Sequence, residues 1–164
     1  MSKQLSSTIA LTAGETPSNG PTSSLFMFEP TTVELGQESL PAEWVLSGSP
    51  APRGKVLARS KDWTTSVVVW ECSAGSFRWH YAREETIFVI SGAAFMLKEN
   101  GEERRFGPGE VGYFPAGTTC TWRVDDHIRK VAVVRETMWS PLGMAVKAWK
   151  KLLRMAGLSG KSPL

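Results

Sequence analysis

The chain has 164 residues, of which 41% are hydrophobic and 21% are charged, so it is long enough for one globular domain with its own core. Its net charge is only +3 and no basic stripe carries interleaved aromatic side chains, which argues against a nucleic-acid partner. No apolar run has the length of a membrane span, and the N-terminal segment lacks the apolar core of a secretory signal, so we expect a cytoplasmic protein.

The two ends of the chain differ in composition from its middle. Residues 1–24 are rich in Ser, Thr, Gly and Pro without periodicity, which predicts a disordered, flexible tail. Residues 25–140 are predicted to form one β-barrel domain, because short strand-like runs recur closely from Lys55 onward. These runs cover residues 55–59, 64–72, 77–81, 86–90, 93–97, 102–106, 111–114, 119–124 and 128–135.

The segments between these runs are turn signals rather than helices. Asn100-Gly101 is a dipeptide that two-residue hairpins prefer, because both central residues need a positive φ. Gly107-Pro108-Gly109 and Pro115-Ala116-Gly117 also interrupt strands. No helix-length segment separates the runs, which weighs against parallel βαβ units. The sequence therefore predicts an all-β barrel or sandwich.

One amphipathic helix is predicted at residues 141–157, followed by a tail at 158–164. Apolar side chains recur there at helical spacing, and basic side chains fall mainly on the opposite side. We expect the apolar side to pack on the barrel or on a partner subunit. We prefer this packing to the alternative, in which the helix lies on an anionic membrane, because a packed terminal helix is much commoner than a peripheral anchor.

Two motifs carry the residues of greatest interest. In the first, ETIFVISG places Glu85 seven positions before Gly92, and WHY places Trp79 and Tyr81 just upstream. In the second, GEVGYFPAGTTCTWRV places Pro115 and Gly117 shortly before Cys120.

This skeleton of glycines, proline and glutamate over residues 64–135 resembles the two motifs of the cupin superfamily. It is similar to the small cupins related to the cupin domain of ureidoglycine aminohydrolase and to the ethanolamine-utilisation cupin. The resemblance implies a single RmlC-like jelly-roll barrel, often a homodimer, without fixing a reaction. In the family pattern histidines hold a metal, but here Trp79 and Tyr81 stand at the histidine pair and Cys120 at the later histidine, with Val124 at an asparagine position.

Strand alternation decides which of these side chains face the barrel interior. Because Phe77, Trp79 and Tyr81 are better buried than Arg78, we expect the odd-numbered residues to point inwards and His80 to point outwards. The predicted inward set is then Trp79, Tyr81, Glu85, Cys120 and Trp122. A one-residue slip would instead bring His80, Glu85 and Cys120 together, and three such ligands can hold zinc, iron or manganese.

Three functions follow from these alternatives. The first is a metal-independent protein that binds a small polar metabolite, with Trp79, Tyr81 and Trp122 enclosing it, Cys120 beside it and Glu85 accepting its hydrogen bond. A catalytic form would use Glu85 or Tyr81 as acid or base and Cys120 as nucleophile. The second is a metal-dependent hydrolase-type or isomerase-type enzyme. The third is a non-enzymatic module that associates with itself.

Each candidate residue also has a purely structural interpretation. Trp79 and Tyr81 would fill a small barrel, and Cys120 would be an inert buried thiol. Cys72 and Cys120 form no metal-type pair, and we expect both as reduced thiols. Glu85 is harder to explain in this way, because a carboxylate facing a barrel interior needs a partner such as Tyr81, an arginine or a ligand. Candidate arginines are Arg78 and Arg123, and His127 is expected on a surface loop.

Overall fold

The computed structural model describes residues 25, 27–97, 100–138 and 140–157. The predicted tails at residues 1–24 and 158–164 lie outside the described residues. The elements, in chain order, are β1 Gly36–Gln37, the short 3-10 helix η1 Ala42–Trp44, β2 Val45–Gly48, β3 Pro52–Arg59, β4 Thr65–His80, β5 Glu84–Gly92, β6 Ala94–Leu97, β7 Glu103–Phe106, β8 Val111–Phe114, β9 Thr119–Arg135 and α1 Ser140–Met155.

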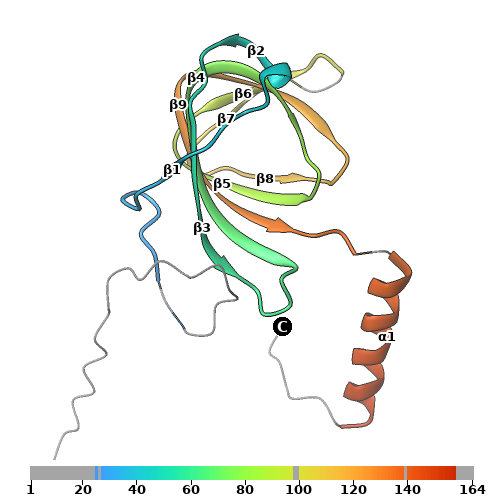
Figure 1. The fold of residues 1–164 in the computed structure, drawn as a ribbon. Coiled ribbons are helices and arrows are strands. Elements are labelled where there is room, and N and C mark those ends of the chain that lie inside the picture. Colours follow the sequence, from blue (N-terminus) through green and yellow to red (C-terminus); the bar gives the residue numbers. More distant parts are fainter. Residues whose placement is uncertain (1–24, 26, 98–99, 139, 158–164) are drawn as a thin grey trace, which may run out of the picture.

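The strands form one antiparallel sheet that curls into a jelly-roll barrel (Figure 1), as the sequence predicts. Its main path runs β1-β3-β4-β9-β5-β8, with β2 added on β4 and the β6–β7 hairpin added on β9. β7 pairs only with β6, and β8 pairs only with β5. Both strands therefore keep an edge without a strand partner among the described residues.

Two long strands hold the barrel together. β4 and β9 pair along their whole length, from Thr65 opposite Arg135 to His80 opposite Thr119. The sequence predicts two strands in place of each, with breaks near Gly75 and after Val124. That prediction is wrong because the break signals produce an irregularity in the pairing while both strands continue beyond it.

This irregularity changes which side chains face inwards along β4. The pairing with β9 shifts between Ser73 and Gly75. Cys72 and Phe77 are both buried although they are five positions apart, an odd spacing that would put them on opposite faces of a regular strand, so the inward parity changes at the shift. The interior side chains of β4 therefore have even numbers before the irregularity and odd numbers after it.

Turn positions in the second half of the barrel follow the sequence prediction. Gly101, next to the β6–β7 hairpin turn, has φ +83°, and Gly117, before β9, has φ +81°. A side chain would be strained at either position, which explains glycine there.

Helix α1 lies apart from the barrel (Figure 1). Its large apolar side chains are exposed, including Trp149 and Leu152. Of the two expected packings, the one on the barrel is therefore wrong among the described residues, and the one on a partner subunit stays a prediction. None of the helices in the described part of the chain has the length and apolar character needed to cross a bilayer.

Candidate functional site

The inward set predicted for the end of β4 is confirmed. Phe77 and Tyr81 are buried and Trp79 packs against the same core, whereas Arg78 and His80 are exposed. His80 lies at the end of β4, where its Nδ1 is 3.1 Å from the Thr119 hydroxyl oxygen. The register that would turn His80 into the barrel is not the one adopted.

Aromatic rings fill the barrel interior around these residues. The Tyr81 ring stacks on Phe114 with centroids 4.7 Å apart, and the Phe77 ring lies parallel to Trp122 at 6.4 Å. Trp122 Nε1 donates a hydrogen bond of 3.0 Å to the Tyr81 hydroxyl oxygen. Burial raises the pKa of the Tyr81 phenol well above its ordinary value. Tyr81 is thus a neutral, hydrogen-bonded part of the core.

A buried lysine that the motifs do not include, Lys130, lies among these rings. Lys130 is 2% exposed, and its ammonium lies 4.7 Å from the ring centroid of Trp70, 5.4 Å from that of Trp79 and 4.6 Å from that of Trp122. Its Nζ is 4.0 Å from Glu85 Oε2. We call Lys130 with these three tryptophans the lysine cage. The indole faces stabilise the cation by cation–π attraction in a place where water is largely absent.

Burial lowers the pKa of Lys130 from 10.5 to about 8, against the opposite influence of the Glu85 carboxylate. Near neutral pH the group therefore remains mostly protonated. Strand alternation on β9 contains the signal that could have revealed Lys130, since Ile128 and Ala132 on either side of it are buried.

Glu85 has a charged partner, as predicted, but the partner is a lysine. Arg123, one of the two arginines considered, pairs instead with Glu103 at 3.0 Å and with Asp125. Arg78 is exposed. Glu85 and Lys130 lie on neighbouring strands β5 and β9, and both face inwards.

The groups in the lysine cage do not suit the metal that the cupin resemblance implies. Lys130 brings a positive charge, and Trp70 Nε1 is a buried donor without a hydrogen-bond partner among the described residues. A metal cation needs ligands with lone pairs, and the Lys130 ammonium would repel it. The carboxylate beside that ammonium is Glu85. No three His, Cys, Asp or Glu residues gather into a possible metal site within the described ranges, so His80, Glu85 and Cys120 do not form one.

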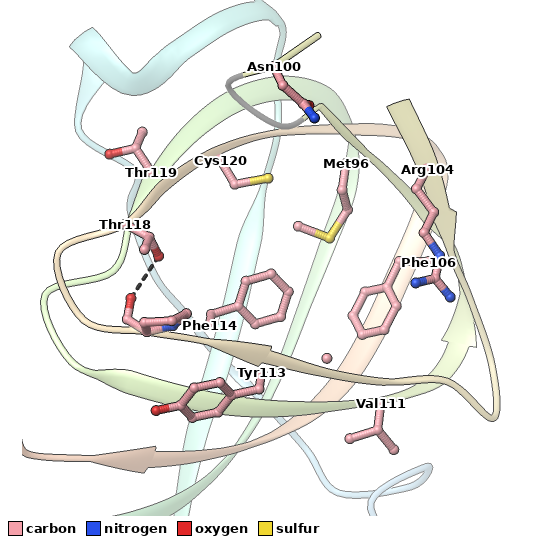
Figure 2. A pocket seen from close by; sticks show the side chains of 12 residues that line it. Met96, Asn100, Arg104, Phe106, Val111, Tyr113, Phe114, Thr118, Thr119 and Cys120 are labelled. Carbon is pink, nitrogen blue, oxygen red and sulfur yellow. Dashed lines mark hydrogen bonds between the residues drawn. The ribbon is translucent and has the colours of Figure 1, made fainter. Parts of the chain in front are cut away.

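A cavity of about 670 Å³ lies between the unpaired edges of β7 and β8, and we call it the β7–β8 cavity. Figure 2 shows Met96, Phe106, Phe114 and Cys120 converging on it, with Asn100 and Arg104 towards one end. Its full lining consists of Met96, Asn100, Arg104, Phe106, Val111, Gly112, Tyr113, Phe114, Pro115, Thr118, Thr119 and Cys120.

The polar groups of this cavity are few and already oriented. Arg104 donates to Glu110 Oε1 at 2.8 Å, yet its side chain is largely exposed to solvent. The Thr118 hydroxyl donates to the Pro115 carbonyl oxygen at 2.7 Å (Figure 2). Most of the surface facing the space is apolar, as is usual for pockets that take small molecules.

The predicted site residues divide between the two regions. Cys120 lines the β7–β8 cavity, whereas Trp79, Tyr81, Glu85 and Trp122 are not among its lining residues. The lining from β7 and β8 was not predicted from the sequence, because β7 lies outside both motifs and β8 occupies the variable positions between Gly109 and Pro115 of the second motif. The two cysteines also differ, although both are thiols. Burial raises the pKa of Cys72 to about 11, and Cys72 is not among the residues that line the cavity.

Comparisons with known proteins agree with this fold. A EutQ-like cupin domain matches residues 59–132. The solved structure of the Clostridium difficile EutQ protein is 20% identical over 69% of this chain and 88% of that chain, with a TM-score of 0.55. A Pseudomonas syringae protein of unknown function from the DUF861 family is 22% identical over 70% of this chain, with a TM-score of 0.62.

The present chain covers 50% of that Pseudomonas protein. A cupin-like protein from Thermotoga maritima is 15% identical over 65% of this chain and 81% of that chain, with a TM-score of 0.52. No curated protein matches the chain. At these identities the solved structures establish the fold and carry no activity across.

Proposed function

We propose that this chain, whose residues 59–132 are a EutQ-like cupin domain, binds a small and largely apolar molecule in the β7–β8 cavity without a resident metal ion. The observation that carries the proposal is the separation of two regions: Trp79 and Tyr81 pack in the aromatic core and Glu85 faces Lys130, while the open space lies beside β7 and β8, where Cys120 borders it. The ligand is therefore less polar than the metabolite predicted from the sequence.

The cavity offers one end for a polar or anionic group. Arg104 and Asn100 lie at that end, whereas Met96, Phe106 and Phe114 supply ring and thioether surface. A guanidinium can hold a carboxylate or sulfonate while keeping some contact with Glu110. We therefore expect an apolar body, aromatic or aliphatic, with one acidic group.

Binding is favoured over catalysis because the three catalytic candidates face different surroundings. Tyr81 accepts from Trp122 in the core, Glu85 faces Lys130, and Cys120 lines the cavity. A shared catalytic role for Tyr81, Glu85 and Cys120 stays a prediction, as do the homodimer and the cytoplasmic location.

The test uses anilinonaphthalene sulfonate, a fluorescent aromatic sulfonate, as a probe of the cavity. Because the exposed apolar side of α1 could also bind it, the measurements are made in a Trp149→Glu background. N-ethylmaleimide should alkylate Cys120 first, since the pKa of Cys72 is raised to about 11 and Cys72 is buried. Alkylation at Cys120 should fill the cavity and abolish probe fluorescence.

Matched variants separate the cavity from the rest of the molecule. A Cys120→Ser protein should keep its probe signal after the same treatment, and a Cys72→Ser protein should lose it. Arg104→Gln should weaken binding of the sulfonate by roughly tenfold, because the sulfonate loses one charged hydrogen-bonding partner. Arg105→Gln removes the same charge from the neighbouring position on β7, outside the lining, and should have little effect. Unchanged fluorescence after alkylation of Cys120 would refute the proposal.

A further inference from the structure

Helix α1 has two chemically distinct faces. At the helical spacing of about 100° per residue, one side collects the large apolar side chains. We call this the apolar face of α1, formed by Leu142, Ala145, Val146, Trp149, Leu152 and Leu153. The opposite side is the basic face, formed by Lys147, Lys150, Lys151 and Arg154.

The apolar face has no cover among the described residues. Trp149 is 61% exposed and Leu152 58%, and α1 lies apart from the barrel (Figure 1). A contiguous exposed apolar surface of this kind marks an interaction site rather than a stable solvent-facing surface. The question is which partner fits it.

The charge of α1 answers that question. The segment Ser140–Met155 contains four basic side chains and no acidic one, in a chain whose net charge is +3. The positive excess of the whole protein is thus gathered on one short helix. The partner must therefore present apolar surface bordered by negative charge.

We propose that α1 lies in the plane of an anionic lipid bilayer, with the apolar face in the acyl-chain boundary and the basic face among the headgroups. Trp149 would sit at the headgroup level that tryptophan prefers, and the lysine stems would reach outward to lipid phosphates. The helix lies on the bilayer, in keeping with its lack of spanning length and apolar character.

A second copy of the chain fits the same surface less well. Two α1 helices paired through their apolar faces would turn their basic faces away from each other and leave those charges without acidic partners on either helix. An anionic lipid surface covers the apolar face and also supplies the missing counter-charge.

The experiment measures co-sedimentation of the full chain with lipid vesicles. Vesicles containing phosphatidylserine should pellet the protein at low ionic strength, and vesicles of phosphatidylcholine alone should pellet much less. Near 1 M salt, where the screening length falls to about 3 Å, binding should be largely lost. The double substitution Lys150→Gln/Lys151→Gln should weaken binding about 25-fold, since each basic residue near an anionic surface contributes about fivefold. Trp149→Glu should abolish it.

A charge-matched control distinguishes the helix from the overall charge. Lys61→Gln/Arg78→Gln removes two exposed positive charges from the barrel and should leave vesicle binding nearly unchanged. Circular dichroism of each variant should match the native spectrum, so that lost binding reflects the changed surface.

Three results would overturn the proposal. One is no sedimentation of the native chain with phosphatidylserine vesicles at low salt. Another is an equal loss of binding in the Lys61→Gln/Arg78→Gln control. The third is self-association without lipid that Trp149→Glu removes, which would make a second copy the partner. None of these readouts involves the β7–β8 cavity, so this proposal stands or fails independently of the proposed function.

Discussion

The lysine cage and the β7–β8 cavity lie in the same barrel and differ in almost every physical respect. In the cage, a buried ammonium is surrounded by three indole rings and faces one carboxylate, Glu85. In the cavity, apolar side chains surround open space, and the charged Arg104 stays close to solvent. The difference shows that the motif positions Trp79, Tyr81 and Glu85 belong to the packed interior, while Cys120 borders the open space beside the unpaired strand edges.

A fixed cation explains why the cage is closed. An internal ammonium supplies positive charge at the barrel centre without an exchangeable ion, and its surrounding rings remove water. The cavity has no such central group. Changes of side chain around the cavity should therefore lower the stability of the fold less than changes in the packed interior. Three pairs of variants test this comparison.

The largest effect should come from truncating an interior ring. Phe77→Ala should lower the free energy of unfolding by about 3–5 kcal/mol, because Phe77 is fully buried against Trp122 and Trp70. Phe114→Ala should cost clearly less, since Phe114 borders the cavity. Urea unfolding of both variants measures the difference. Equal losses would remove the distinction between a packed and an open region.

The next effect concerns the protonation of Lys130. Between pH 8 and 10.5 the unfolded chain keeps a proton that the folded lysine has lost, so this group makes stability rise with pH in that window. Below about pH 8 both states are protonated, and the cost of burying the charge is fully present. A shift from 10.5 to about 8 corresponds to roughly 3 kcal/mol.

The raised pKa of Cys72 acts in the opposite direction between about pH 9 and 11, because there the folded thiol keeps a proton that the unfolded chain loses. The measurement is therefore a difference taken at each pH: the unfolding free energy of the native protein minus that of the Lys130→Met variant. The contribution of Cys72 is nearly the same in both proteins, so it largely cancels. This difference should rise by roughly 3 kcal/mol from pH 8 to 10.5. For the control Lys61→Met, a change at an exposed lysine, the difference in unfolding free energy should not vary with pH. If the curves of unfolding free energy against pH for the native protein and Lys130→Met ran parallel, the burial assigned to Lys130 would be contradicted.

A smaller effect should come from one hydroxyl group. Tyr81→Phe removes the acceptor of Trp122 Nε1 and leaves a buried donor unsatisfied, so it should cost about 1–3 kcal/mol. Tyr113→Phe is the matched control, because Tyr113 is 61% exposed and the change should alter stability by less than about 0.5 kcal/mol. Thermal unfolding at neutral pH compares them. A neutral Tyr81→Phe would mean that the core relaxes around the indole.

Much of the fold could be predicted from local signals. Strand runs, glycine turns and the motif skeleton all indicate a jelly roll, and the aromatic alternation at Phe77, Trp79 and Tyr81 correctly turns His80 outwards. The continuity of β4 and β9 was missed. Gly75 and Asp125 carry turn-like composition, and only pairing with the neighbouring strand decides whether such residues end a strand or bend it.

Short-range periodicity is enough to predict the barrel, the side-chain parity after Gly75, the burial of the aromatic rings and the amphipathic character of α1. Only the tertiary structure decided that Glu85 meets Lys130, that three tryptophans from two strands surround that ammonium, and that the cavity opens beside β7 and β8. Those facts depend on which strands become neighbours and on the pairing shift in β4. Both are set by contacts between residues far apart in the chain.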